Sequence, residues 1–374
     1  MPARITFLTN TMLKINSSYQ TKSWEQLLSD SKVNADDLSQ FIDVNPDMVS
    51  RVIEKYPMRI NPYFFSLIQQ KGDPIWKQCV PDVRELEDHK TLTADPLFEE
   101  PQSPTPGLIH RYPDRVVFMV SNKCAVYCRH CMRKRRVGEK RGISANTISR
   151  GIAYIQSNPA IRDVILSGGD PLLLVDDQIE ELLTRIHKIS HVDMIRIHTR
   201  VPCSLPQRIT NDLVYVLKQV APVYINIQFN HPNEITPQAS QACGMLADAG
   251  IPLGSQTVLL KGVNDDPDIM MDLMRCLLKI RVRPYYLHHG DPVKGTGHFR
   301  TTIKKGLEIM RHLRGRLSGI GVPSYMIDLP GGGGKVPLLP EYVLKDESGE
   351  LTVKNFEGEL FKYCGAPRNG RNET

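Results

Sequence analysis

Two patterns of apolar residues divide the chain. Up to about residue 110, apolar residues recur at intervals of three and four, for example in WEQLLSD and DMVSRVIEKY, which predicts short helices. Beyond this point, short β-branched or aromatic runs alternate with helical segments. The runs that we predict to be strands are residues 116–120, 163–170, 194–199, 223–229, 255–260 and 283–289, followed by a seventh apolar run at 324–330.

The order of these segments predicts a parallel α/β sheet. Six strand–helix units follow one another at intervals of about 30 to 50 residues. Thr210 and Thr236 occupy expected helix N-caps, and Gly250 occupies an expected helix end. A polar or glycine-rich segment follows each of the first four strands, at the end where barrel folds build their sites. We therefore expect a partial (β/α)6-type barrel with its site at this end.

Two segments flank the predicted barrel. An acidic, proline-rich connector, DPLFEEPQSPTPG (95–107), has too many turn-forming residues for a regular element. The C-terminal tail alternates as two short strands around DESGE, which predicts a hairpin. We expect a mostly helical region over residues 1–110, the barrel over 111–345 and the tail over 346–374.

Composition and charge exclude little beyond membrane proteins. The 374 residues are 41% hydrophobic and 24% charged, as in ordinary globular proteins. The net charge of +6 suits small anionic partners as well as nucleic acid, so we expect no nucleic-acid partner from charge alone. The N-terminus lacks a signal-peptide pattern, and no apolar run is long enough to span a membrane. These features predict a cytoplasmic protein.

Three of the eight cysteines form a C-x3-C-x2-C array within CAVYCRHCMRKRR, residues 124–136. Clustered cysteines in an intracellular chain indicate metal or redox chemistry. Three thiolates on a [4Fe–4S] cluster leave one iron open, and an open metal position is where catalysis can occur. A zinc site completed by His130 or a distant histidine is the alternative. The segment SGGDP (167–171) favours the cluster, since its glycines would let the backbone approach a small ligand closely.

The second informative stretch is DLPGGGGKVPLLP, residues 328–340. It is not a P-loop, because Val336 stands where that motif requires Ser or Thr. A flexible turn with a solvated lysine is one interpretation. The flanking prolines favour another, since they restrict the chain on both sides of Lys335. A lysine held in this way is suited to forming a Schiff base with an aldehyde cofactor.

The cysteine array after the first strand and the GGDP segment after the second resemble the radical S-adenosylmethionine (SAM) enzymes. This resemblance implies that Cys124, Cys128 and Cys131 bind a [4Fe–4S] cluster whose fourth iron is held by SAM. It also implies that a one-electron reductant, such as flavodoxin or ferredoxin, drives release of a 5′-deoxyadenosyl radical. The residues implied to bind SAM are Ser167, Gly168, Gly169, Asp170 and Gln256.

A closer resemblance covers residues 20 to 360. The motifs HRYPDRV, CRHCMRKRR, TRVPCSLPQRIT, FNHPNEIT, VLLKGVND, IRVRPYY, GHFRT and PGGGGK together resemble the lysine 2,3-aminomutase family. The resemblance implies an isomerase that moves the amino group of L-lysine from C2 to C3, through an aldimine of pyridoxal 5′-phosphate (PLP), to give β-lysine. The implied residues are Lys335 as PLP ligand, Arg111 and Arg115 near its phosphate, Arg133 at the substrate carboxylate, and Asp291 and Asp328 at its ε-ammonium.

Other interpretations stay open at this point. The substrate could be arginine or glutamate, or the chain could belong to the branch that makes β-lysine for a translation elongation factor. An iron–sulfur enzyme that modifies RNA is an alternative of another class. Some relatives hold structural zinc through a cysteine after VND and a cysteine-rich tail, but this chain has Asp266 and only Cys364 there, so we predict no zinc. Gln228 stands where relatives have histidine, and we expect a homo-oligomer.

Overall fold

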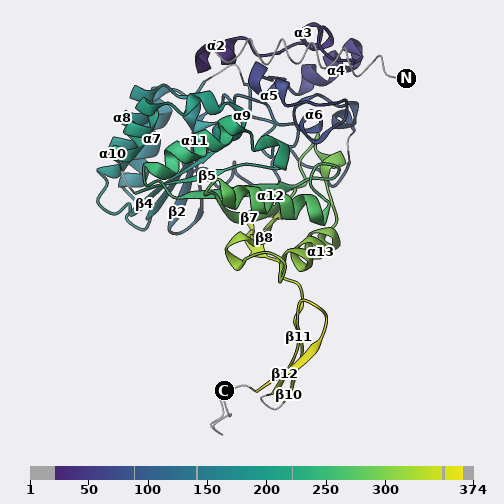
Figure 1. Cartoon of the computed structure of the whole chain (residues 1–374). Helices are drawn as coiled ribbons and strands as arrows, with labels where there is room; N and C mark the ends of the chain where they lie inside the picture. Colours follow the sequence, from purple (N-terminus) through teal and green to yellow (C-terminus); the bar gives the residue numbers. More distant parts are fainter. Residues whose placement is uncertain (1–21, 88, 140–141, 221, 348–349, 365–374) are drawn as a thin grey trace.

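The computed structural model describes residues 22–87, 89–139, 142–220, 222–347 and 350–364. Its centre is a nine-stranded sheet whose strands lie side by side in sequence order (Figure 1). The strands are β1 (Leu108–Tyr112), β2 (Arg115–Ser121), β3 (Asp163–Gly168), β4 (Met194–Thr199), β5 (Val223–Ile227), β6 (Leu253–Leu259), β7 (Arg283–His289), β8 (Ser324–Leu329) and β9 (Gly334–Pro337).

The parallel part of the sheet confirms the α/β barrel expected from the sequence. Strands β2 to β8 pair in parallel, and they include all six predicted strands and the seventh apolar run. Antiparallel strands β1 and β9 were not predicted, and they form the two edges of the sheet. Both edge strands carry expected site residues, Arg111 on β1 and Lys335 on β9.

Helices connect the parallel strands and cover the outer face of the sheet (Figure 1). Thr210 and Thr236 are N-caps as predicted, since each hydroxyl accepts a hydrogen bond from the backbone N–H three residues later. Gly250, with φ of +81°, follows the end of a helix as predicted. These helices are α7 (Ala145–Gln156), α8 (Asp176–His187), α9 (Val201–Ser204), α10 (Asn211–Gln219), α11 (Pro237–Asp248), α12 (Pro267–Lys279) and α13 (Ile303–Leu313).

The N-terminal region is helical, as the apolar spacing predicted, and it packs on the barrel. The buried Asn61 side chain donates hydrogen bonds to the backbone oxygens of Ala125 and Ser204, at 3.1 and 2.8 Å. One hydrophobic core runs from Leu27 through the barrel to Tyr325. The helices of this region are α2 (Trp24–Ser29), α3 (Ala35–Ser39), α4 (Pro46–Lys55), α5 (Pro62–Ser66), α6 (Pro74–Cys79) and the short 3-10 helix η1 (Val83–Leu86). None of the helices in the described ranges is long and apolar enough to cross a membrane.

The tail differs from the predicted hairpin by one strand. Strands β10 (Val343–Glu347) and β11 (Glu350–Lys354) form the hairpin around DESGE, and β12 (Leu360–Cys364) adds a third antiparallel strand. The alternating run LFKYC, after a turn at Asn355–Gly358, supplies this strand. The small sheet projects away from the barrel (Figure 1). It leaves large apolar side chains exposed: Val343, Leu344, Phe356, Leu360, Phe361 and Tyr363.

Candidate functional site

A cavity of about 800 Å³ lies inside the curved sheet. Its lining reaches from the N-terminal ends of β3 and β4 to the loops at the opposite ends of the parallel strands. Gln228 also lines it. Every residue that the sequence analysis assigned to the site lines this one cavity: Arg111, Arg115, Cys124, Cys128, Cys131, Arg133, Ser167, Gly168, Gly169, Asp170, Gln256, Asp291, Asp328 and Lys335.

The cysteine array lies on the loop that follows β2. The backbone N–H of Arg129 on this loop donates to the carbonyl of Gln78 in α6, so the N-terminal region helps to hold the loop. Burial raises the pKa of the Cys131 thiol to about 11 and raises that of Cys124 well above its usual value. The Cys124 and Cys131 thiols therefore remain protonated until a cation binds, because metal binding to a thiol releases its proton.

Arg200 joins the cysteine loop to two other parts of the chain. Its Nη1 donates to Cys128 Sγ at 2.7 Å, and its Nη2 donates to Gln78 Oε1 at 2.7 Å and to Glu234 Oε1 at 2.8 Å. Arg200, Gln78 and Glu234 are buried, and Cys128 is partly buried. Arg200 belongs to the HTR segment after a predicted strand, but no role for it could be predicted, because its partners are far away in the sequence.

The glycines of SGGDP are needed for packing within the protein. Gly168 has φ of +126°, and a Cβ atom there would lie 2.2 Å from the Ser121 carbonyl oxygen. At Gly169 a Cβ atom would lie 2.4 Å from the Lys123 oxygen. The glycines thus allow the loop after β3 to pack against the start of the cysteine loop. That these glycines also allow a small ligand to approach the backbone stays a prediction.

Asp170 connects the loops after β3 and β4. Its Oδ1 accepts from the Thr199 hydroxyl at 2.7 Å and from Leu172 N–H at 3.1 Å, and its Oδ2 accepts from Arg200 N–H at 2.7 Å. Burial raises the pKa of this carboxyl despite these hydrogen bonds. Asp170 therefore fixes the wall of the cavity next to the cysteines.

Each cation of the basic run that follows the third cysteine is paired with an acid. Three of the acids belong to the acidic connector 95–107, so connector and cysteine loop are held together. Burial lowers the pKa of Lys134 to about 8. The cations left unassigned by the sequence thus have partners, and the run offers no support for RNA binding. The pairs are Arg133–Glu99 at 2.7 Å, Lys134–Glu85 at 2.5 Å, Arg135–Asp95 at 2.9 Å and Arg136–Glu100 at 3.4 Å.

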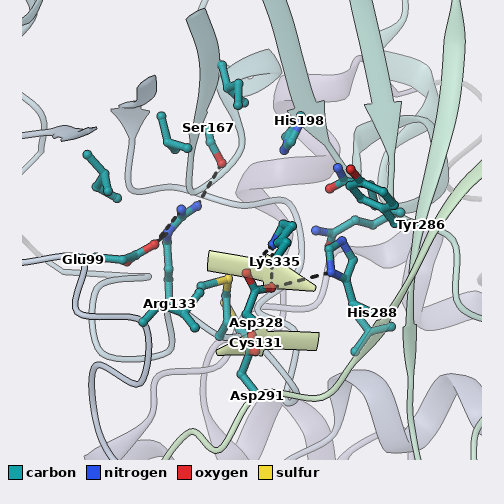
Figure 2. Close-up of a pocket in the computed structure, with 18 of the residues that line it drawn as sticks. Glu99, Cys131, Arg133, Ser167, His198, Tyr286, His288, Asp291, Asp328 and Lys335 are labelled. Carbon is teal, nitrogen blue, oxygen red and sulfur yellow. Dashed lines mark hydrogen bonds and ion pairs between the residues drawn. The ribbon is translucent and has the colours of Figure 1, made fainter. Parts of the chain in front are cut away.

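Lys335 faces Asp328 across the β8–β9 strand pair (Figure 2). Its Nζ donates to Asp328 Oδ1 at 2.7 Å and Oδ2 at 2.5 Å. The glycine run between them reverses the chain, and its positive φ angles include +67° at Gly331 and +78° at Gly332. The lysine is therefore fixed on an edge strand by register, and the interpretation as a flexible turn with a solvated lysine is wrong.

Asp291, on the loop after β7, lies beside this pair (Figure 2). Burial, and next the neighbouring carboxylate of Asp328, raise the pKa of Asp291 to about 7. The Lys335 ammonium acts in the opposite direction on the same group. This corner thus holds two carboxyl groups and one ammonium, and it favours the arrival of another cation.

Arginines gather at another part of the wall. Arg115 stacks over the Tyr112 ring, with its guanidinium 4.0 Å from the ring centre, and also pairs with Asp114. Arg111 lies on the neighbouring strand β1. Arg196, which was not predicted, lines the same cavity from β4 and pairs with Asp163. Guanidinium groups are the usual partners of a phosphate.

Two histidines of the cavity wall were also missed. His198 lies on β4 and His288 on β7 (Figure 2). Burial lowers the pKa of both imidazoles, to about 3 for His288, so both are neutral near pH 7. Alternation along MIRIHT could have indicated that Arg196 and His198 point to the same face of the sheet.

The zinc interpretation of the cysteine array finds no support. His130, its proposed fourth ligand, has its Nε2 3.2 Å from the Asn230 side-chain amide, with its ring edge against Phe299. Within the described part of the chain, no three His, Cys, Asp or Glu side chains form a site for a single metal ion. Whether the protein lacks structural zinc stays a prediction, since the tail beyond residue 364 lies outside the described residues.

Comparison with known proteins gives these residues a context. Residues 118–274 match the family model of the Radical SAM superfamily, and residues 310–373 match that of Lysine-2,3-aminomutase. An L-lysine 2,3-aminomutase of Methanococcus maripaludis is 47% identical over 94% of this chain and 84% of its own length. One of Fusobacterium nucleatum is 44% identical over the same shares. A glutamate 2,3-aminomutase of Clostridioides difficile is 43% identical over 91% of this chain and 82% of its own.

Identity near 45% along most of both chains, together with the radical SAM match over the barrel, leaves one assignment. The chain belongs to the lysine 2,3-aminomutase family of radical SAM isomerases.

Proposed function

We propose that this protein moves the α-amino group of L-lysine to C3 and gives β-lysine. The observation that carries this proposal is the contact of Lys335 with Asp328, which holds a primary alkylammonium in the cavity of the cysteines. The side chain of L-lysine ends in the same group. Asp291 beside the pair offers a second carboxylate, so the corner can hold the ammonium of Lys335 and that of a substrate together.

The cavity residues fit the three groups that radical aminomutases use. Thiols at three positions suit a [4Fe–4S] cluster with one iron open to SAM. When bound, the cluster and SAM supply a 5′-deoxyadenosyl radical, and PLP supplies the aldehyde that carries the amino group. Lys335 would hold the aldehyde, and the arginine-lined wall would hold the phosphate. The residues that we propose for SAM are Ser167, Gly168, Gly169, Asp170 and Gln256.

The protein itself contributes orientation and charge. Arg133 presents guanidinium N–H groups to the substrate carboxylate, and Asp328 with Asp291 fixes the far end of the substrate by its ammonium. A substrate held at both ends keeps the carbons between them in a fixed position, which a short-lived radical requires. The ion pairs between connector and basic run hold the Arg133 segment in place at the cavity wall.

The two carboxyl groups disfavour glutamate as the substrate. A side-chain carboxylate beside Asp328 and Asp291 would place like charges together in a buried corner. Anaerobic incubation of the reconstituted enzyme with L-lysine, L-arginine and L-glutamate, followed by chiral analysis of products, tests the proposal. We expect β-lysine from L-lysine and no product from glutamate. Conversion of glutamate or arginine in preference to lysine would contradict it.

We also propose a homo-oligomer and a small one-electron donor, such as flavodoxin or ferredoxin. The exposed apolar side chains of the tail support an association with further copies of the chain. The cytoplasmic location stays a prediction, and cell fractionation followed by detection of the protein tests it.

A further inference from the structure

Glu99 makes the closest contacts of Arg133 in the cavity wall (Figure 2). Arg133 Nε and Nη2 lie 2.9 and 2.7 Å from Glu99 Oε1, and Nη1 donates to Ser167 Oγ at 3.0 Å. Glu99 is only 4% exposed, and its second oxygen accepts from Arg135 at 3.1 Å. Two arginines thus hold the Glu99 carboxylate in place.

These contacts leave part of the Arg133 guanidinium free to bind a ligand. A guanidinium has five N–H groups: Nε and Nη1 each donate one hydrogen bond, and the ion-pair contact of Nη2 with Glu99 occupies at most one more. At least one N–H therefore remains on each terminal nitrogen. A carboxylate can accept two such N–H groups at once, so Glu99 and a substrate can occupy Arg133 together.

We infer that Glu99 is a positioning residue for the carboxylate site, in addition to the residues of the proposed function on which this inference rests. By fixing the guanidinium before the substrate arrives, Glu99 removes the cost of ordering a long side chain upon binding. If Glu99 had a different role, its removal would change substrate affinity in the opposite direction. If Glu99 competed with the substrate for Arg133, its removal would tighten binding.

The next residue supplies a matched control. Glu100 belongs to the same connector and pairs with Arg135 and Arg136, but its side chain is 60% exposed. Glu99→Gln and Glu100→Gln remove the same charge one residue apart. Glu99→Asp keeps the charge and shortens the side chain.

The test is a binding titration without reductant, so that no turnover occurs. Holoenzyme loaded with PLP is titrated with L-lysine and with L-lysinamide, which lacks the carboxylate, and the visible absorbance gives each Kd. We expect Glu99→Gln to raise the Kd of L-lysine about tenfold and to change that of lysinamide less than about twofold. Glu100→Gln should change neither, and Glu99→Asp should lie between the wild type and Glu99→Gln.

Three results would overturn the inference: an unchanged Kd for L-lysine in Glu99→Gln, a tighter one, or an equal loss for lysinamide. If Glu99→Gln does not take up PLP, Glu99→Asp decides, and wild-type affinity for both ligands then overturns the inference. Binding of L-lysine by the wild type tests the proposed function separately from the role of Glu99. Should it bind another amino acid instead of L-lysine, that amino acid and its amide replace the pair in the titration.

Discussion

Asp328 is the direct cross-strand partner of Lys335, and both of its carboxylate oxygens accept hydrogen bonds from the lysine ammonium. Strand register therefore explains why seven residues separate the two. The glycine turn between β8 and β9 returns the chain so that acid and amine meet on one face of the sheet. Asp328 already binds the ammonium of Lys335 in the absence of a substrate. Its preference for a cationic substrate can therefore be tested by substitution.

Replacing Asp328 with Asn should remove that preference. Loss of one partner from a largely buried ion pair costs about 3 kcal/mol, so we expect kcat/KM for L-lysine to fall roughly a hundredfold. Iron content and PLP absorbance should be retained. Asp272→Asn, at an acid that is 66% exposed on α12, is the control and should match the wild type. Unchanged lysine kinetics in Asp328→Asn would refute the role.

The raised pKa of Asp291, about 7, predicts a pH dependence of substrate binding. Below pH 7 this carboxyl takes up a proton and no longer attracts an ammonium, so L-lysine should bind more weakly as the pH falls from 8 to 6. Asp291→Asn should flatten this dependence. Spectroscopic titrations at several pH values, with both proteins, provide the measurement, and parallel profiles would contradict the prediction.

The raised pKa of Asp291 affects stability in the opposite direction: substrate binding should strengthen as the pH rises, whereas stability should fall. The folded protein keeps a proton on Asp291 up to about pH 7, whereas the unfolded chain releases it near the ordinary value of 3.8. The contribution of Asp291 to stability should therefore decrease as pH rises through this window. In the cofactor-free protein we expect Asp291→Asn to raise Tm at pH 8 and to have little effect at pH 4.

Arg200 should influence the reduction potential of a cluster bound by the three cysteines. A cationic hydrogen-bond donor beside a ligand sulfur stabilises the more negative, reduced state. Arg200→Gln should therefore shift the midpoint potential to a more negative value while iron content stays unchanged. A potentiometric titration followed by electron paramagnetic resonance measures this. Arg200→Lys, which keeps the charge, should show a smaller shift, and equal potentials in all three proteins would exclude the role.

The packing at Gly168 predicts that its replacement is costly. Gly168→Ala would place a Cβ atom against the Ser121 carbonyl in a backbone conformation that other residues avoid, so we expect a loss of about 2–4 kcal/mol in unfolding free energy. Iron uptake should fall as well, because the cysteine loop starts there. Gly319→Ala is the control, since no atom lies within 4 Å of its Cβ position. Urea denaturation of both variants gives the comparison.

The tail offers a test of the proposed oligomer. Phe361 and Tyr363 on β12 are 53% and 64% exposed. Replacing both with Ser should lower the mass measured by analytical ultracentrifugation, because the interface between copies loses these apolar contacts. The Tm should change by less than a few degrees. An unchanged mass would place the interface elsewhere or show that the chain is a monomer.

Much of the barrel could be predicted from the sequence because its strands follow simple rules. Buried parallel strands are runs of β-branched residues, and their connecting helices carry recognisable caps. The segment of Lys335, GKVP, has no such pattern, since glycine and proline are poor strand formers. Its strand exists because β8 pairs with it in a register that no local rule predicts.

The cofactor and substrate residues came from motifs, whereas the residues that hold them did not. Glu99 and Arg200 contact Arg133 and Cys128 across sequence separations of 34 and 72 residues. Each lies in a segment whose local pattern is equally consistent with an exposed side chain. Only the packing of the connector and of the β4 loop against the cysteine loop brings these pairs together.

The bond between the Tyr112 hydroxyl and the backbone N–H of Lys335, at 2.7 Å, joins the first strand of the sheet to the last. The position of Lys335 relative to β1 therefore depends on the twist that accumulates over strands β2 to β8. A substitution that flattens the sheet far from the cavity would move this amine relative to the cysteines, which sit on the second strand's loop. The curvature of the sheet thus sets the distance between Lys335 and the three cysteines.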